Sequence, residues 1–415
     1  IRLICIMISG VFVGTNYTAI NPFYPTIAHD KGLGPAAIGV ILAAMPLFSF
    51  LLSPALSRKV GWLGRVNSLI ISTLLTTLGS FILAFSMEID NPIIFGVLGF
   101  AARGLSGAAI GLETIAAFSI INSEFPNNIE KAVSYLELVS SVGYSLGPLI
   151  LSTMYQVLGA QTAFIIYGSV IAASAVPIFF IKVSESSYEA KEQKVSASDL
   201  LSHTPVVANI FALTVYAFAA QGWAALLALH LDELSYGTTA ASVIYFVYCI
   251  FYLSFCLIPA YIPRTVPRNY IVFSSFVFAS VAYAFVAPLI SIPGSVWLVG
   301  IGSTVLGLGY ALVYGTLHSV PIFPILLRYC IDVVGMQDED QVSNAASSKF
   351  YSGLIPQSLA IGMLTGAPVA GLIAELTSIR QYFSTFCVIF LMLSPIYLYY
   401  SRNPKASPYL PLTGK

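Results

Sequence analysis

Three charged side chains lie inside long apolar segments, where a charge is costly and is usually retained for function. They are Arg103 and Glu113 in one segment and Glu137 in the next. A glutamate in such a segment must be protonated, paired or hydrated, so Glu137, and after it Glu113, is predicted to exchange protons. A structural hydrogen bond or an ion pair with Arg103 is the alternative. Arg103 and Glu113 are separated by about 15 Å of helix, which excludes a direct pair within it.

Uncharged polar and aromatic side chains in other apolar segments are candidates for binding a small solute. Pro22 interrupts the first segment and frees backbone carbonyl groups there. Further along, Tyr310, Tyr314 and His318 repeat at a spacing of four on one helix face, and a histidine titrates near neutral pH. With Arg103, the predicted solute-binding residues are Asn16, Asn21, Tyr24, Gln221, Trp223, Tyr310, Tyr314 and His318.

Aromatic stripes of this kind more often pack one helix against another. That interpretation stays open for the three residues from Tyr310 to His318. It applies equally to a second stripe, formed by Tyr245, Tyr248 and Tyr252.

The elements that must position these residues are transmembrane helices. Of the 415 residues, 57% are hydrophobic and only 9% are charged, whereas soluble domains carry roughly a quarter charged residues. A spanning helix needs about 20 apolar residues, and only helices satisfy their own backbone groups in hydrocarbon. Twelve spans are predicted, at 3–24, 36–57, 65–87, 92–122, 131–156, 162–182, 206–230, 238–262, 270–290, 295–320, 350–375 and 380–401.

The spans form two sets of six, separated by the most polar stretch of the chain. Lysine and arginine are retained on the cytoplasmic side of a membrane. With a cytoplasmic N-terminus, fifteen of the eighteen basic residues fall on that side, Lys31 and Arg380 lie opposite, and Arg103 lies within the membrane. The predicted parts are an N-terminal six-helix bundle (1–183), a cytoplasmic linker (184–205), a C-terminal six-helix bundle (206–402) and a cytoplasmic tail (403–415).

A glycine motif in the fifth span recurs 219 residues later in the eleventh span. The repeated residues are Gly143, Gly147 and Pro148, and then Gly362, Gly366 and Pro368. Small residues at a spacing of four let two helices approach closely, and a proline beside them bends the helix. Duplicated six-span halves with a solute site near the midplane are the design of many secondary transporters.

These motifs resemble those of the major facilitator superfamily. The glycine motif of Gly143, Gly147 and Pro148 is similar to the antiporter motif of this superfamily. The run from Arg103 to Gly107 is similar to its RxxQG element, with Ser106 in place of the glutamine. The loop after the second span keeps the basic Arg58 of the GxxxDRxG element but lacks its first glycine and its aspartate. The resemblance implies an all-α membrane fold of two pseudo-symmetric six-helix bundles, with these residues acting in the conformational change.

Four short motifs taken together are similar to the vesicular amine transporter group, and within it to the vesicular polyamine transporter-like branch. They are Pro22-Phe-Tyr-Pro25, Phe125-Pro-Asn-Asn128, Leu136-Glu137 and Pro321-Ile-Phe-Pro324. The resemblance implies proton-coupled antiport of an amine or polyamine by alternating access, in a vesicle or another endomembrane.

The chain departs from that group where a cation would need a counter-charge. The group places a carboxylate early in span seven and acids in span ten, where this chain has Ala224-Ala225-Leu226, Tyr314 and Ile325. An anionic or zwitterionic metabolite is therefore an alternative substrate. A second alternative is a transporter-like protein without transport, acting as a sensor or as a structural subunit of a larger membrane complex.

Other classes of function find no support in the sequence. It carries no nucleotide-binding glycine loop, no metal-ligand cluster and no nucleophile set, so no enzyme activity, cofactor or metal is expected. The net charge is zero, which offers no basic surface for nucleic acid. The expected partners are the lipid bilayer, a small organic solute and protons.

Overall fold

The structure, a computed structural model, describes residues 2–124, 129–179, 201, 204–255, 258, 262, 268–287, 295–319 and 355–401. Within these ranges the chain is helical, with short turns between the helices. The N-terminal half contains α1 (Arg2–Thr18), α2 (Tyr24–Asp30), α3 (Pro35–Leu63), α4 (Arg65–Ser86), α5 (Pro92–Glu124), α6 (Ile129–Leu158) and α7 (Ala160–Phe179). The C-terminal half contains α9 (Thr204–Glu233), α10 (Thr238–Phe255), α12 (Arg268–Val286), α13 (Val296–Ser319), α16 (Ile355–Leu376) and α17 (Ile379–Ser401).

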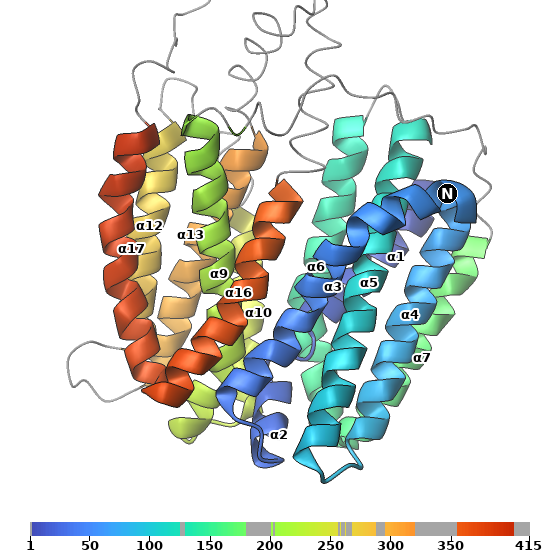
Figure 1. Cartoon of the computed structure of the whole chain (residues 1–415), viewed down its shortest axis with the longest axis horizontal. Coiled ribbons are helices and arrows are strands. Elements are labelled where there is room, and N and C mark those ends of the chain that lie inside the picture. Colours follow the sequence, from blue (N-terminus) through green and yellow to red (C-terminus); the bar gives the residue numbers. More distant parts are fainter. Residues whose placement is uncertain are drawn as a thin grey trace, which may run out of the picture.

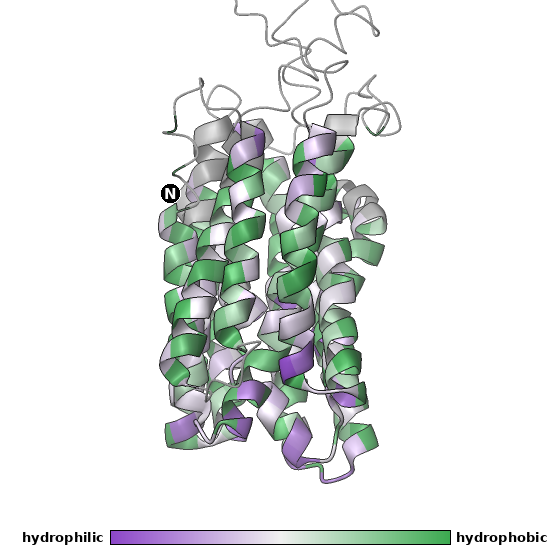
Figure 2. Ribbon diagram, turned by 90° about the vertical axis from the view of Figure 1, so that its left-hand side faces the viewer, coloured by the Kyte–Doolittle hydropathy of each residue, from purple (hydrophilic) through white to green (hydrophobic). Residues whose placement is uncertain are grey.

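The predicted all-α membrane fold is confirmed. Ten stretches of the described residues are long and apolar enough to cross a membrane. The first span, formed by α1 and α2, and α6 complete the twelve. Large apolar side chains such as Leu51, Val97 and Met392 are exposed on the outside, where lipid would cover them. Hydrophobic residues run along the height of the helices, and hydrophilic ones are most frequent near the two ends of the bundle (Figure 2).

The first span is two helices, α1 and α2, and the interruption predicted at Pro22 lies between them. A proline ring clashes with the carbonyl of the residue four positions earlier, and proline has no N–H to donate. For Pro22 that earlier residue is Thr18, where α1 ends. The chain then turns through a bond from the Asn21 N–H to the Thr18 carbonyl (3.1 Å) before α2 begins at Tyr24. This break leaves backbone groups at the end of α1 without partners inside the helix.

The four main contacts between helices in one half have counterparts in the other half. In the N-terminal half, α1 packs on α6, α3 on α5, α4 on α5 and α4 on α7. In the C-terminal half, α9 packs on α16, α10 on α13, α12 on α13 and α12 on α17. Taken as spans, these are the same four pairs, so the two halves repeat one arrangement.

The repeated glycines make the close contacts between α1 and α6 and between α9 and α16. A Cβ atom at Gly143 would lie 2.2 Å from the Val11 carbonyl oxygen of α1, and one at Gly147 would lie 2.7 Å from that of Thr15. The C-terminal half repeats this on α9, where Gly362 meets the Thr214 carbonyl and Gly366 that of Phe218. A Cβ atom would lie 2.2 and 2.3 Å from these two oxygens. The glycine repeat therefore sets how closely the first and fifth spans of each half approach.

The two halves are joined at the end where α2 lies, which we call the α2 end. There Ser242 donates to Ser152 (2.6 Å), and the Gln156 amide donates to Thr239 (2.8 Å). A third bond joins the Ala36 N–H of α3 to the Glu375 carboxylate of α16 (3.0 Å). Helices α3 and α16 lie side by side at this end and diverge toward the opposite end, where α7 ends and α9 begins (Figure 1). We call that opposite end the linker end.

Lys31 joins the C-terminal end of α2 to the chain that follows α4, at the α2 end of the molecule. Its ammonium group donates to the carbonyls of Met87 (3.0 Å) and Ile89 (2.8 Å), which follow the last turn of α4. It also lies 3.9 Å from the exposed Asp90 carboxylate and 5.4 Å from the centre of the Phe95 ring. A basic residue on the predicted non-cytoplasmic side therefore has a structural reason to be there, because it caps a helix C-terminus.

Substituting Lys31 by glutamine is expected to destabilise the protein by about 1–3 kcal/mol, because both charge-assisted bonds are lost. Thermal unfolding in detergent measures this change. The exposed Arg380 at the same end provides the control, and Arg380→Gln is expected to shift the unfolding temperature much less. Equal shifts for the two variants would contradict the structural role of Lys31.

Candidate functional site

Arg103 lies at the centre of a buried polar cluster in the N-terminal half. Its side chain is only 2% exposed on α5, and its Nη1 donates to the carbonyl oxygen of Asn16 (3.2 Å). That carbonyl belongs to the last turn of α1, where such groups lack donors within the helix. The break at Pro22 thus creates the acceptor that Arg103 uses.

Tyrosine side chains, and no described carboxylate, lie within electrostatic range of the guanidinium. No described carboxylate forms an ion pair with Arg103, and the side chains that interact with it electrostatically are all tyrosines. They are Tyr17 of α1, Tyr24 of α2, Tyr167 of α7 and Tyr245 of α10. The positive charge of Arg103 therefore has no fixed counter-charge among the described residues.

Two hydrogen bonds position the side chains of Tyr167 and Tyr245. The Tyr167 hydroxyl lies 2.9 Å from the Thr15 hydroxyl of α1. The Asn21 amide, in the break between α1 and α2, donates to the Tyr245 hydroxyl (2.8 Å). Because Tyr245 belongs to the C-terminal half, this second bond brings both halves to the cluster.

Several polar atoms of the cluster are buried without a hydrogen-bond partner. They are Nε of Arg103, Nδ2 of Asn16, the hydroxyl of Tyr24 and Oδ1 of Asn21. Leaving a buried polar group without a partner costs about 1–3 kcal/mol, and more for a charged group. A cluster with several such atoms is suited to bind a polar group that approaches from outside the protein.

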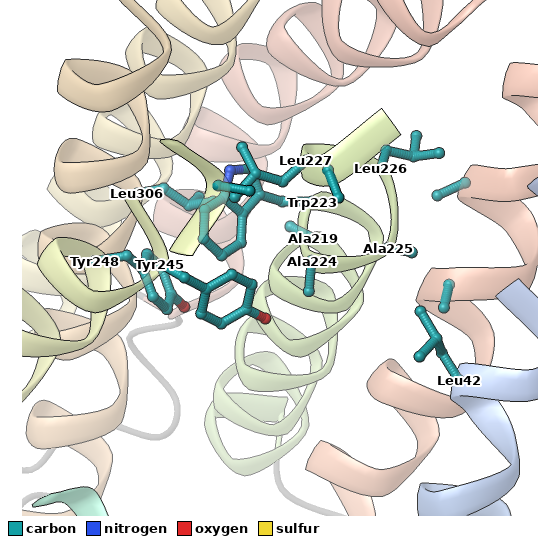
Figure 3. Packing of buried hydrophobic residues seen from close by; sticks show 14 of the residues in the cluster. Leu42, Ala219, Trp223, Ala224, Ala225, Leu226, Leu227, Tyr245, Tyr248 and Leu306 are labelled. Atoms are coloured by element: carbon teal, nitrogen blue, oxygen red, sulfur yellow. The ribbon is translucent and has the colours of Figure 1, made fainter. Parts of the chain in front are cut away.

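Aromatic rings of the C-terminal half hold Tyr245 against this cluster. Trp223 of α9 is fully buried, and its ring centre lies 4.8 Å from that of Tyr245 and 4.5 Å from that of Tyr248. The indole N–H donates to the Ser303 hydroxyl (3.1 Å), so Trp223 itself has no free polar atom. Figure 3 shows the three rings packed together beside α9. In this conformation Trp223 packs against Tyr245 and holds that ring in place.

Comparison with known proteins assigns the family. The family model described as Major Facilitator Superfamily matches residues 6–328. The chain belongs to this superfamily. Solved members share the fold at low sequence identity. The nucleoside transporter NupG is 13% identical, with a TM-score of 0.70 over 96% of this chain and 98% of that one. The human organic anion transporter MFSD10 is 16% identical, with a TM-score of 0.61 over 96% and 98%.

The chain matches its curated relatives over only part of their length. The human MFS-type transporter SLC18B1 is 25% identical over 155 residues, which cover 37% of this chain and 34% of the relative. Multidrug resistance protein 1 of Bacillus subtilis is 23% identical over 242 residues, 57% of this chain and 60% of the relative. The SLC18B1 match agrees with the predicted resemblance to the vesicular amine transporter group. The family members named here are transporters of small solutes.

The superfamily's RxxQG element has a clear role in packing. Gly107 lies against α3, where an added Cβ atom would be 2.1 Å from the Met45 carbonyl oxygen. Ser106, which replaces the glutamine, is 3% exposed and lies against Gly79 of α4. The element therefore fixes α5 between α3 and α4, and this packing holds Arg103 toward α1.

The other predicted site residues lie apart from Arg103 or outside the described side chains. Glu113 is buried on α5, and Gln221 is buried two residues before Trp223. Tyr310 of α13 stacks on Tyr252 with ring centres 5.2 Å apart, which fits the packing interpretation of its stripe. No group of three His, Cys, Asp or Glu residues in the described part of the chain could hold a metal ion. The side chains of Arg58, Glu137, Tyr314 and His318 lie outside the described part.

Sequence reasoning did not select three of the tyrosines around Arg103. Tyr17 and Tyr167 were not candidates, and Tyr245 was interpreted only as part of a packing stripe. The sequence signal that could have identified these residues is a tyrosine within an apolar span. The chain has 24 tyrosines, so this signal selects too many residues. Such a signal does not distinguish a hydroxyl near a buried charge from one near lipid headgroups.

Proposed function

We propose that this protein is a secondary active transporter that moves a small organic solute by alternating access, in exchange for protons. The observation that carries the proposal is the set of contacts between the halves. Helix α3 packs on α16, and α10 packs on α6, so the second span of each half meets the fifth span of the other. Two equivalent contacts let the halves rock as rigid bodies about a site between them.

The contacts at the α2 end are those that must break during transport. They include the bonds from Ser242 to Ser152 and from Ala36 to Glu375. The described conformation is thus closed at the α2 end, and the solute would exchange at the linker end. By the positive-inside rule the linker end faces the cytoplasm, with both termini on that side, and the α2 end faces a vesicle lumen or the cell exterior.

Two classes of substrate are compatible with this proposal. The resemblance to vesicular amine transporters favours an amine or polyamine. The buried surroundings favour an anionic or zwitterionic solute, because the positions of the expected carboxylate are apolar and buried. Ala224, Ala225 and Leu226 are each at most 2% exposed, and Arg103 supplies a positive charge nearby.

Proton exchange is assigned to Glu137 and to Glu113, two glutamates within apolar spans, of which Glu113 is buried. Purified protein in liposomes with an imposed pH gradient, offered amines, amino acids and organic anions, tests this. Glu137→Gln, and more weakly Glu113→Gln, is expected to abolish proton-driven accumulation and to leave solute exchange without a gradient, because an amide cannot carry a proton. The exposed Glu88 provides the matched control Glu88→Gln.

Each part of the proposal has its own contradicting result. The absence of flux for every solute under both gradient polarities would contradict transport and favour the sensor or structural role. Unchanged proton-driven uptake in both glutamate variants would contradict the coupling while leaving transport intact.

A further inference from the structure

We propose that Arg103 and the hydrogen-bond donors around it bind a carboxylate group of the transported solute. The inference rests on the proposed transport function and names the class of its substrate. It concerns the cluster between the end of α1, the start of α2, and the facing sides of α5 and α10. The substrate class is an organic acid or an amino acid, and not a polyamine.

The first argument is the balance of donors and acceptors. The buried atoms without a partner include three donors, Nε of Arg103, Nδ2 of Asn16 and the hydroxyl of Tyr24. The Tyr245 hydroxyl accepts from Asn21, and its own hydrogen has no acceptor among the described residues. One acceptor, Oδ1 of Asn21, is also without a partner. A ligand that completes this set must bring mainly acceptors, and an ionised carboxylate brings acceptors only.

The second argument is charge. Arg103 is 2% exposed, interacts with tyrosines and has no carboxylate partner in the described chain. A buried charge without a counter-charge is strongly unfavourable, and an anionic ligand supplies the missing charge. A diamine would instead bring a second positive charge and only donors. A carboxylate can also pair with one guanidinium through two parallel hydrogen bonds.

The third argument is position. The cluster lies where the first span is broken, and it includes Tyr245 from the C-terminal half. A carboxylate bound to Arg103 would therefore contact groups of both halves. Binding at such a position biases the relation between the halves, which a carrier requires of its substrate site.

A single buried tryptophan provides a direct binding measurement that needs no transport. The chain has three tryptophans, and Trp62 and Trp297 are 81% and 79% exposed whereas Trp223 is fully buried. In a Trp62→Phe/Trp297→Phe background the emission therefore comes from Trp223, which packs on Tyr245. Ligands are succinate, 4-aminobutyrate and putrescine, which share one butane backbone and differ in their end groups, with inorganic phosphate as a fourth.

Succinate and 4-aminobutyrate are expected to change the emission of Trp223 saturably, and putrescine and phosphate are not. Arg103→Gln is expected to weaken binding of both acids roughly 30-fold or more, because one partner of a buried charge pair is removed. Arg380→Gln, the same change at an exposed arginine, is expected to leave binding unchanged. Saturable binding of putrescine that does not depend on Arg103, or binding of phosphate alone, would overturn the inference.

A second variant tests the inference independently, in case Arg103→Gln does not fold. Asn16→Asp places a carboxylate beside Arg103, since the Asn16 backbone already contacts the guanidinium. It is expected to raise the unfolding temperature and to abolish binding of both acids, because the internal carboxylate occupies the place of the ligand. Undiminished binding of succinate by Asn16→Asp would overturn the inference. Acid binding without any uptake would leave this inference standing and contradict the proposed transport function.

Discussion

Leucine in place of Gly371 is expected to reduce uptake by about 10- to 100-fold while both halves stay folded. A Cβ atom at this position would lie 2.1 Å from the Pro35 carbonyl oxygen of α3. The matching glycine of α3, Gly39, makes the reciprocal contact, 2.3 Å from the Ala367 carbonyl of α16. Because backbone faces backbone across the two halves, a larger side chain fits only if the halves separate at the α2 end.

Two measurements follow this change. Uptake into liposomes reports the loss of transport, and labelling of Ser242→Cys by a maleimide reports separation of the halves. Ser242 is 2% exposed and bonded to Ser152 when the α2 end is closed, so a cysteine there is expected to react faster after Gly371→Leu than in the parent. Gly300 of α13 is the matched control, because its Cβ atom would meet a single atom, 3.9 Å away. Transport by Gly371→Leu at the rate of the parent would contradict the closed α2 end.

Alanine at Gly143 or at Gly362 is expected to destabilise the protein by similar amounts, about 1–3 kcal/mol each. At both positions the added Cβ atom would lie 2.2 Å from a backbone carbonyl oxygen of the first span of the same half. These contacts lie within a half and do not separate when the halves rock. The expected result is therefore a lower unfolding temperature in detergent and not a changed accessibility of Ser242→Cys.

The double variant extends the test of the repeat. The two glycines lie in different halves, so their effects are expected to add. Gly96→Ala is the control, because the nearest atoms to its Cβ would be those of the Leu33 side chain at 3.6 Å. A large effect at Gly143 and none at Gly362 would contradict the equivalence of the two halves.

Two pairs of glycines have different structural roles, one within each half and one between the halves. Gly143 and Gly362 fix the first span to the fifth span within each half. Gly39 and Gly371 fix the halves to each other at one end of the molecule. In the proposed alternating access only the second pair lies at a contact that changes, so only its substitution is expected to stop transport in a folded protein.

The sequence by itself determined the membrane architecture. Hydropathy and the gaps between charges predicted twelve spans, and the helices follow them with ends that differ by a few residues, as in α9, which ends at Glu233 and not at 230. The glycine repeat also predicted the close packing now seen on α1 and α9. These features are readable because the length of a span, its polarity and the size of a residue are properties of a local stretch of chain.

Only the tertiary structure decided which polar groups meet. Arg103 bonds to a carbonyl 87 residues away, and Asn21 bonds to a tyrosine 224 residues away in the other half. The sequence identified Arg103, Asn16, Asn21 and Tyr24 as polar residues in apolar spans, but it gave no reason to join them with Tyr245. Their meeting depends on the rotation of each helix about its axis and on the crossing of helices from both halves. These are set by packing over the whole molecule and leave no local pattern in the chain.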